Sequence, residues 1–308
     1  MNCKNFRFLL IPFLLLVVAC DRIVEDPRGD EMARLQAWLQ VHNITTVPTA
    51  TGLYYLNTLE GTGNSPVDDN WMVYSFVSRN LDDVVYETTN KDTALLYDMF
   101  SAKKHYVPTF RQYLSKTSQF KGLAEGLGMM KEGGKARLII PSSLGANGSY
   151  TTMIYDIDFK KVVEDPEKYE RDSIVSYLSH HLGYTNVVDS IYFKDSIPGT
   201  GSLLVANDTV VTVKYVGKYL DGVVFDTNIK TIGAANGITV SDKDTLLKFK
   251  VGSTEVINGY SIALKQMKKG GVAKVIIPSI SAYGVTGKSP ILPYEPLLFE
   301  ITLVEINP

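Results

Sequence analysis

The feature that most constrains the fold of this chain is an internal repeat with a nearly constant offset. Glu132–Ser142 contains Gly-Gly-Lys-Ala-Arg-Leu-Ile-Ile-Pro-Ser, and Lys269–Ser279 contains Gly-Gly-Val-Ala-Lys-Val-Ile-Ile-Pro-Ser, 137 residues later. The tripeptide Gly61–Gly63 returns as Gly199–Gly201, 138 residues later. This period exceeds the roughly 20–50 residues of solenoid repeats. The repeat therefore predicts two copies of one domain.

Each copy is predicted to begin with a helix. Apolar residues recur at helical spacing in residues 31–42, and Trp38 of that segment returns as Tyr177, 139 residues later. The chain turns polar near residue 165, where we place the boundary. We predict an α+β fold with tandem domains at 31–164 and 165–308. Each is expected to be an antiparallel curved β-sheet wrapped on one α-helix and preceded by a linker helix.

Residues 1–20 have the pattern of an export signal. Lys4 and Arg7 supply the positive end, and the apolar run Phe8–Ala19 is shorter than the roughly 20 residues needed to span a bilayer. The run ends in Val-Val-Ala-Cys, which resembles the bacterial lipobox, where the signal is cut before a cysteine that carries lipid. We therefore predict lipidation of Cys20.

An ordinary cleaved signal with an incidental cysteine is the alternative to this lipoprotein signal. The segment 21–30 is charged and contains proline and glycine, so we predict a short tether there. The expected location is the cell envelope, lipid-anchored at the outer membrane or the periplasmic face. Several acyl chains give a stable anchor where one is marginal.

Composition limits the classes of partner and site. The formal net charge is −2, which makes nucleic acid an unsuitable partner. The two cysteines, Cys3 and Cys20, both precede the predicted domains, so the body has neither a disulfide framework nor a cysteine metal site. The four histidines lack ligand-like spacing. We therefore predict no metal and no cofactor.

A hairpin in the second copy brings aromatic and acidic residues together. Val211, Val213 and Tyr215 alternate on one face of a predicted strand. The Asp-Gly pair that follows is a strong signal for a tight turn, because glycine tolerates the positive φ of primed turns. The return strand carries Phe225 inward and places Asp226 at its end.

This hairpin and the motifs after it resemble FKBP-type peptidyl-prolyl cis-trans isomerases over about residues 190–306. The matching motifs, in order, are Phe249–Gly252, Glu255–Gly259, Ala282-Tyr-Gly284 and Ile291-Leu-Pro293, followed by Phe299. With the lipobox, the chain resembles a tandem FKBP-type lipoprotein of the Bacteroidetes. The resemblance places pocket walls at Tyr215, Phe225, Asp226, Leu247, Val256, Ile257, Tyr260, Tyr283, Ile291 and Phe299.

The resemblance also implies roles for these residues. The catalytic set is Tyr215, Phe225, Asp226, Ile257, Tyr283 and Phe299, and the substrate-binding set is Leu247, Val256, Tyr260 and Ile291. The Tyr283 hydroxyl and the Ile257 backbone N–H would bind substrate carbonyls. Asp226 would orient the pocket through Tyr215. Phe225, Tyr260 and Phe299 would surround the proline ring. A plain hydrophobic core is the alternative for these aromatic residues.

Three departures from the family pattern accompany this resemblance. Tyr260 stands where the family usually has tryptophan, and Leu247 stands where it often has phenylalanine. Both keep the floor apolar, so we expect altered substrate preference and not loss of activity. A stretch from about 229 to 242 lengthens the loop after Asp226 and could cover the pocket or bind another molecule. The pocket helix is predicted over Thr254–Lys268 from its apolar stripe.

The first copy lacks parts of this pocket. Phe76, Tyr86 and Glu87 match Tyr215, Phe225 and Asp226, but there is no Ala-Tyr-Gly and no Ile-Leu-Pro loop. We predict that its fold persists without isomerase activity. Its segment 90–116 is richer in aromatic residues than a solvated loop, which indicates either packing within the domain or a surface for unfolded clients.

The predicted function is isomerisation of X-Pro bonds in exported proteins by the second copy. The expected partners are proline-containing polypeptides, the membrane through Cys20, and macrolide inhibitors. The first alternative is a non-catalytic FKBP-fold chaperone or binding lipoprotein. A second alternative, part of a surface motility or secretion machine, rests only on the predicted anchor.

Overall fold

The computed structural model of this chain describes residues 26–145 and 150–307. The predicted signal peptide and Cys20 lie outside these residues. Within the two described ranges, no helix combines the length and the apolar character needed to cross a membrane.

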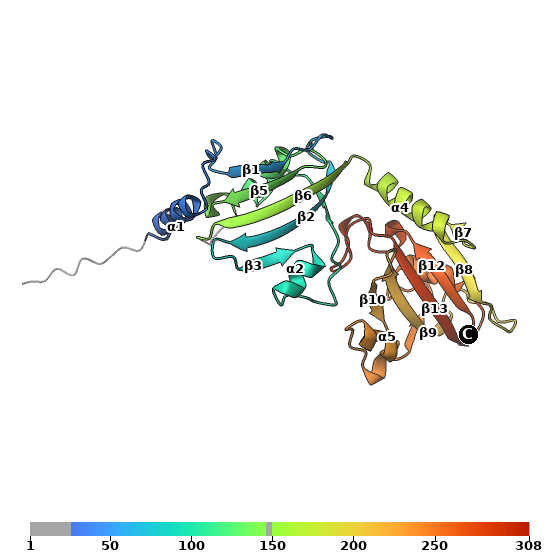
Figure 1. Ribbon diagram of the computed structural model, residues 1–308. Coiled ribbons are helices and arrows are strands. Elements are labelled where there is room, and N and C mark those ends of the chain that lie inside the picture. Colours follow the sequence, from blue (N-terminus) through green and yellow to red (C-terminus); the bar gives the residue numbers. More distant parts are fainter. Residues whose placement is uncertain (1–25, 146–149, 308) are drawn as a thin grey trace, which may run out of the picture.

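The first half of the chain forms an antiparallel sheet of six strands, drawn from blue to light green in Figure 1. Its order is β1-β5-β6-β2-β3, and β4 also pairs with β2. The strands are β1 (Tyr54–Leu59), β2 (Trp71–Asn80), β3 (Val85–Thr88), β4 (Thr109–Gln112), β5 (Lys135–Ile140) and β6 (Met153–Val163).

The second half forms a seven-stranded antiparallel sheet in the order β10-β9-β13-β12-β8-β7, with β11 paired to β9. The path from β8 through β12, β13 and β9 to β10 matches the path from β1 to β3 in the first sheet. The strands are β7 (Thr185–Val188), β8 (Ile191–Ile197), β9 (Val210–Tyr219), β10 (Val224–Thr227), β11 (Leu247–Lys250), β12 (Val272–Ile277) and β13 (Leu297–Asn307).

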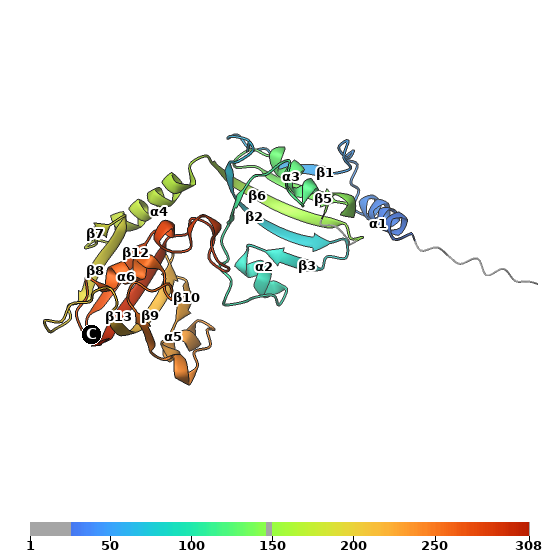
Figure 2. The same ribbon diagram turned by 180° about the vertical axis from the view of Figure 1, so that it is seen from behind.

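The helices repeat in the same order. Each half contains a long helix before its sheet, a short helix after the hairpin, and another helix across the sheet; Figure 2 shows α3 and α6 in these last positions. In order, the helices are α1 (Pro27–Val41), α2 (Lys91–Leu96), α3 (Lys121–Gly128), α4 (Pro166–His180), α5 (Lys230–Ala235) and α6 (Asn258–Leu264). Short 3₁₀ turns are η1 (Ser142–Leu144), η2 (Asp242–Asp244), η3 (Ser279–Ser281) and η4 (Gly284–Thr286).

The structure corrects the predicted extent of the tether at 21–30. Helix α1 begins at Pro27, because the Asp26 side chain accepts a hydrogen bond from the Gly29 N–H at 3.0 Å and caps the helix. Proline is tolerated in the first turn, where its missing N–H has no helical partner to lose. Helix α4 starts in the same way, with Asp165 as its cap and Pro166 at its first position.

The pocket helix is also shorter than the predicted Thr254–Lys268. Ile257 has extended backbone angles (φ −61°, ψ 146°), and α6 begins only at Asn258. Turns replace both ends of the predicted helix, and the Gly252 N–H donates to the Ser261 hydroxyl at 3.1 Å. The apolar stripe still faces the core, where Leu264 and Met267 are buried.

The stretch from 229 to 242 contains α5, which follows β10. The first half has a helix of the same length, α2, at the same place after β3. This stretch therefore has a counterpart in the first half, although it departs from the family pattern.

A buried glutamate attaches the leading helix to the sheet in each half. Glu170 of α4 accepts hydrogen bonds from the Ser279 N–H at 2.5 Å and from the Ser279 hydroxyl at 2.7 Å. Glu31 of α1 accepts from the N–H and hydroxyl of Ser142 in the same way. Burial raises the pKa of Glu170, and the Ser279 hydrogen bonds oppose this shift. These contacts fix the start of the loop that follows the Pro-Ser pair in each copy.

Candidate functional site

In the second sheet, four of the predicted site residues lie on three neighbouring strands. Tyr215 lies on β9, Phe225 and Asp226 lie on β10, and Phe299 lies on β13. In the pairing of β9 with β13, Phe299 is opposite Gly217. A side chain at position 217 would meet both neighbouring rings, because an added Cβ would lie 2.7 Å from Phe225 Cζ and 3.1 Å from Phe299 Cε1. Glycine at this position allows the two rings to approach.

Four aromatic rings form a cluster in which three pairs are nearly perpendicular, while the rings of Tyr215 and Phe299 are tilted at 52°. The Phe299 ring lies 5.2 Å from that of Tyr260 and 5.8 Å from that of Phe225, with interplanar angles of 89° in both cases. The rings of Tyr215 and Tyr260 are 6.3 Å apart at 87°. Such edge-to-face pairs suit the ring quadrupoles. Tyr260 and Phe299 form a buried floor, and Tyr215 and Phe225 are half-buried above it.

A tyrosine and a carboxylate are paired at the edge of this cluster. The Tyr215 hydroxyl donates to Asp226 Oδ2 at 2.8 Å. The backbone around Tyr215 is held by the buried Asn228, whose Oδ1 accepts from the Tyr215 N–H at 2.8 Å and whose Nδ2 donates to the Val213 carbonyl at 3.0 Å. Thr227 adds a hydrogen bond from its hydroxyl to the Tyr215 carbonyl at 2.7 Å. Sequence reasoning missed Asn228 and Thr227, although their polarity directly after Asp226 was a visible signal.

Tyr283 approaches the same carboxylate from the loop before β13. It is half-buried between η3 and η4, and the Lys288 ammonium lies 5.6 Å from the centre of its ring. Burial raises the pKa of the Tyr283 hydroxyl, and the negative charge of Asp226 raises it further. The hydroxyl therefore stays protonated near neutral pH and can donate a hydrogen bond to a carbonyl group.

The remaining predicted residues pack around the same core. Tyr260, Ile291 and Phe299 are among its buried members, and Tyr215, Phe225, Leu247, Val256, Ile257 and Tyr283 pack against it partly buried. Asp226 is exposed, and its hydrogen bond with Tyr215 connects it to this group of residues. The structure thus brings all ten predicted residues together. Their roles remain predictions.

The buried Tyr260 hydroxyl has no hydrogen-bond partner among the described residues. Burial raises the pKa of this tyrosine well above its ordinary value. The predicted apolar floor therefore contains one unsatisfied polar atom.

The corresponding surface of the first half is arranged differently. Ser78 stands at the position of Gly217, as the pairing of Ser78 with Glu87 and of Gly217 with Asp226 shows. Tyr86, which corresponds to Phe225, is 55% exposed. A cavity of about 370 Å³ remains there, lined by residues that include Leu123, Leu144 and Tyr155. No described residue there supplies a pair like Tyr215 and Asp226.

Metal chemistry has no candidate site in residues 26–145 and 150–307, where no group of three His, Cys, Asp or Glu side chains could hold a metal ion. The described site residues offer apolar contact and hydrogen bonds from hydroxyl and backbone groups.

Residues 202–304 match the family model of the FKBP-type peptidyl-prolyl cis-trans isomerase. The FKBP-type peptidyl-prolyl cis-trans isomerase FkpA of Buchnera aphidicola is 37% identical over 109 residues, which are 35% of this chain and 38% of that protein. FK506-binding protein 4 of Neurospora crassa is 35% identical over 121 residues, 39% of this chain and 23% of that protein. The chain thus spans less than two fifths of the length of either relative. A peptidyl-prolyl cis-trans isomerase structure from Pseudomonas syringae is 30% identical, with 46% of this chain and 94% of that one covered and a TM-score of 0.38.

Proposed function

We propose, from the premise that residues 202–304 are a domain of the FKBP-type peptidyl-prolyl cis-trans isomerase family, that the chain isomerises X-Pro bonds in polypeptide clients. The observation that carries the proposal is the Tyr215–Asp226 hydrogen bond beside a cluster of four aromatic rings, three pairs of which are nearly perpendicular. The predicted enzyme family is confirmed for this stretch. The activity and substrates of the whole protein are proposals.

The mechanism needs no nucleophile. Rotation about a peptide bond faces a barrier of about 18–20 kcal/mol, because the planar amide is stabilised by resonance. The twisted transition state has lost this resonance and is less polar. An apolar pocket therefore favours it over the planar amide in water. Each 1.36 kcal/mol of preferential stabilisation increases the rate about tenfold.

Each residue of the site would have its own role in this reaction. Phe225, Tyr260 and Phe299 would enclose the proline ring. Tyr283 would donate a hydrogen bond to a substrate carbonyl, and the Ile257 N–H would bind a second carbonyl. Asp226 holds the Tyr215 hydroxyl and so fixes one side of the pocket opening. Macrolides that occupy FKBP pockets should compete with the substrate.

The proposal extends to both halves of the chain. The repeated strand path and the repeated helices support a tandem arrangement of two FKBP-like domains, 31–164 and 165–308. The first domain would be non-catalytic, because Ser78 stands at the position of Gly217 and Tyr86, which corresponds to Phe225, is 55% exposed.

The proposed location is the cell envelope, with the clients being exported proteins. The export-signal pattern at residues 1–20 and the Val-Val-Ala-Cys motif support a lipid anchor on Cys20. Mass spectrometry of the protein from its native host would test this. An acylated Cys20 peptide, lost in Cys20→Ala, is the expected result, whereas an unmodified peptide starting elsewhere would exclude the anchor.

The decisive experiment measures cis/trans exchange of Ala-Leu-Pro-Phe by NMR with the full chain. We expect faster exchange with the wild type and at least a tenfold loss, about 1.4 kcal/mol of transition-state stabilisation, in the double variant Asp226→Ala and Tyr283→Phe. Phe225→Leu should also lose activity. Its matched control Tyr86→Leu, at the corresponding position of the first half, should not.

A folded wild type without any effect on exchange would exclude catalysis. The alternative of a non-catalytic client-binding protein would then replace it.

A further inference from the structure

We infer that a client with an acidic, extended segment beside its proline lays this segment in a groove between the two halves of the chain. The inference rests on the proposed function and specifies its substrate class. It assigns the first half a direct part in client recognition.

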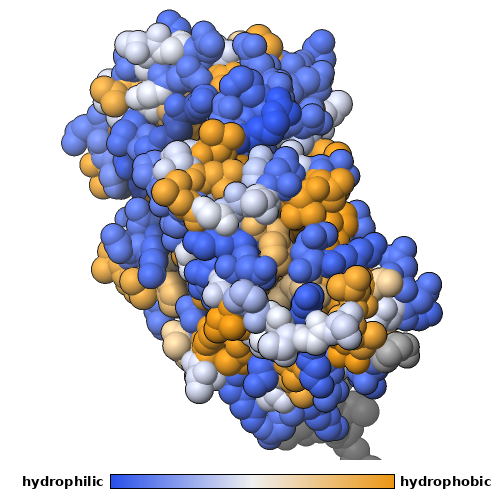
Figure 3. Space-filling model, turned by 90° about the vertical axis from the view of Figure 1, so that its right-hand side faces the viewer, coloured by the Kyte–Doolittle hydropathy of each residue, from blue (hydrophilic) through white to orange (hydrophobic). Residues whose placement is uncertain are grey.

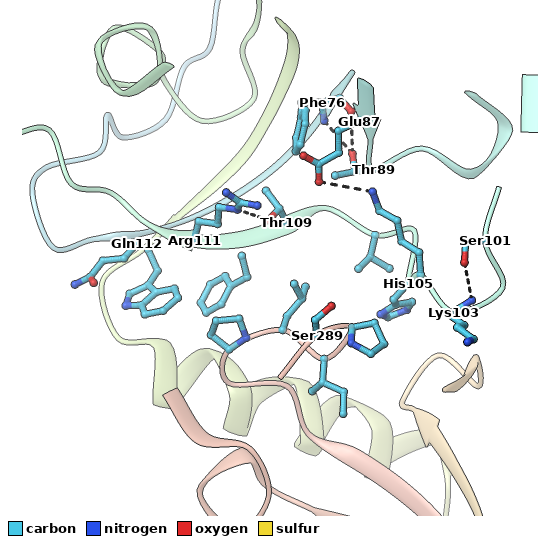
Figure 4. Close-up of a pocket in the computed structure, with 18 of the residues that line it drawn as sticks. Phe76, Glu87, Thr89, Ser101, Lys103, His105, Thr109, Arg111, Gln112 and Ser289 are labelled. Carbon is cyan, nitrogen blue, oxygen red and sulfur yellow. Dashed lines mark hydrogen bonds and ion pairs between the residues drawn. The ribbon is translucent and has the colours of Figure 1, made fainter. Parts of the chain in front are cut away.

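The groove has a volume of about 760 Å³, within the roughly 300–1,000 Å³ of ligand-binding clefts. Figure 4 shows its walls: residues of the first half on one side and the loop with Ser289 of the second half on the other. The apolar part of the lining comes from Trp71, Phe110 and Leu114 and from the loop 289–293. Leu114 is 40% exposed, so the groove opens to solvent.

One residue is shared by the groove and by the core that underlies the proposed proline site. Ile291 is 7% exposed, belongs to the core beneath the pocket and also lines the groove. Its loop is closed on itself: the Ile291 N–H donates to the Lys288 carbonyl at 2.7 Å, and the Tyr294 N–H donates to the Gly284 carbonyl at 3.1 Å. The loop that carries Ile291 therefore belongs both to the core of the proposed proline site and to the wall of the groove.

Ring contacts hold the wall from the first half in place. Tyr294 of the loop meets Trp71 edge-on at 5.1 Å and Phe110 at 6.2 Å. His105 stacks on Tyr219 at 3.8 Å, and its Nε2 lies 2.9 Å from an Asp221 carboxylate oxygen. Part of the aromatic segment 90–116 therefore packs against the second half. Figures 1 and 2 both show the loop before β13 against the first half.

The polar part of the lining is basic, although the whole chain has a net charge of −2. Lys103, Lys104 and Arg111 line the groove with a single carboxylate, Glu87. Lys104 lies 3.7 Å from this carboxylate. Lys103 and Arg111 are exposed and form no ion pair with any described residue. A segment with acidic and apolar side chains therefore complements the groove in both charge and hydropathy.

The test compares peptides that differ only beside the common core Ala-Leu-Pro-Phe. One set carries six additional residues with three glutamates before or after the core, and a matched set carries three lysines. For the wild type we expect kcat/KM to be about fivefold higher for one of the glutamate peptides than for the tetrapeptide, with no gain for the lysine peptides. Two exposed ion pairs account for a factor of this size.

Two double variants locate the effect. In Lys103→Glu with Arg111→Glu, the ratio of kcat/KM for the glutamate peptide to that for the tetrapeptide should fall about fivefold, and the lysine peptide should gain. In the control Lys121→Glu with Lys131→Glu, which changes two exposed lysines of the same half outside the groove, the ratio should stay as in the wild type. Circular dichroism melting checks that both variants are folded.

The outcomes separate the two proposals. Equal rates for glutamate and lysine peptides, or an equal fall in both double variants, would overturn the groove while leaving the isomerase intact. A wild type that fails on the tetrapeptide itself would overturn the proposed function and the groove with it.

Discussion

At the residue scale, the pocket depends on one position that has no functional group. Gly217 leaves room for the Phe225 and Phe299 rings, and the first half has Ser78 in its place. The family resemblance named ten residues that lie together in the structure, because aromatic and acidic side chains in a fixed order are visible in a sequence. It did not identify Gly217, since the need for an absent side chain appears only when two strands are paired in register.

Gly217→Ser should convert the active pocket toward the geometry of the first half. The new side chain would push the Phe225 ring away, because the clash is with the far end of that ring. We expect at least a tenfold fall in kcat/KM for Ala-Leu-Pro-Phe and a loss of only about 1–2 kcal/mol in the free energy of unfolding. Ser78→Gly is the matched control and should leave kcat/KM unchanged. Retained activity in Gly217→Ser would contradict this account.

Removal of the unsatisfied Tyr260 hydroxyl should raise the free energy of unfolding, whereas Gly217→Ser should lower it. Tyr260→Phe removes a buried polar atom that has no partner among the described residues, so the free energy of unfolding should rise by about 1 kcal/mol. Tyr215→Phe removes a hydroxyl that is bonded to Asp226 and should not stabilise the protein. Urea unfolding of both variants makes the comparison. Destabilisation by Tyr260→Phe would mean that this hydroxyl has an interaction of its own.

At the element scale, the repeat predicted the order of the helices and strands but not the lengths of the helices. Helix α6 is shorter than its apolar stripe because Ile257 remains extended, and α1 is longer than predicted because Asp26 caps it. The attachment of α1 and α4 by buried glutamates was not predicted. Glu170 and Ser279 are 109 residues apart, and a helical surface glutamate looks no different in sequence from a buried one.

Glu170→Ala should loosen α4 from the second sheet. Ser279 would lose both of its bonds to the carboxylate, and hydrogen bonds to charged groups are worth about 1.5–3 kcal/mol. We expect a loss of about 2–3 kcal/mol in the stability of the second half, with faster amide hydrogen exchange in α4. Glu31→Ala should produce the same change in α1 and spare α4. If either variant increased amide hydrogen exchange equally in α1 and α4, the two glutamates would not each stabilise only their own helix.

At the scale of the whole molecule, the contact between the two halves was beyond the reach of sequence reasoning. The segment 90–116 allowed either internal packing or a client surface, and periodicity could not show that His105 and Phe110 meet the second half. The exposed apolar side chains elsewhere are dispersed; Figure 3 shows them on one face as separate clusters within a hydrophilic surface. In the groove, basic groups of the first half meet apolar groups of both halves.

The same contact contains a carboxyl group that makes it sensitive to pH. The pKa of Glu295 is raised from 4.5 to about 7, chiefly by burial; His105 lowers it, and the negative charges of Asp221 and Glu170 raise it. Because the folded state favours the protonated form, its stabilising contribution is complete below pH 4.5 and is lost as the pH rises through 7. The loss amounts to at most about 3 kcal/mol. The pKa of Asp221 is lowered by its hydrogen bond with His105, so its contribution disappears only in acid, outside this window.

Trp71 can report this change, since it is one of two tryptophans in the chain and lies against Tyr294 beside Glu295. In a Trp38→Phe background, the urea midpoint followed by Trp71 fluorescence should fall between pH 5 and pH 8. Glu295→Gln keeps the neutral form at every pH and should remove most of this dependence. If the midpoint of Glu295→Gln falls as steeply as that of the parent protein, another group controls the contact. A flat profile in the variant is the expected result and would assign the pH dependence to Glu295.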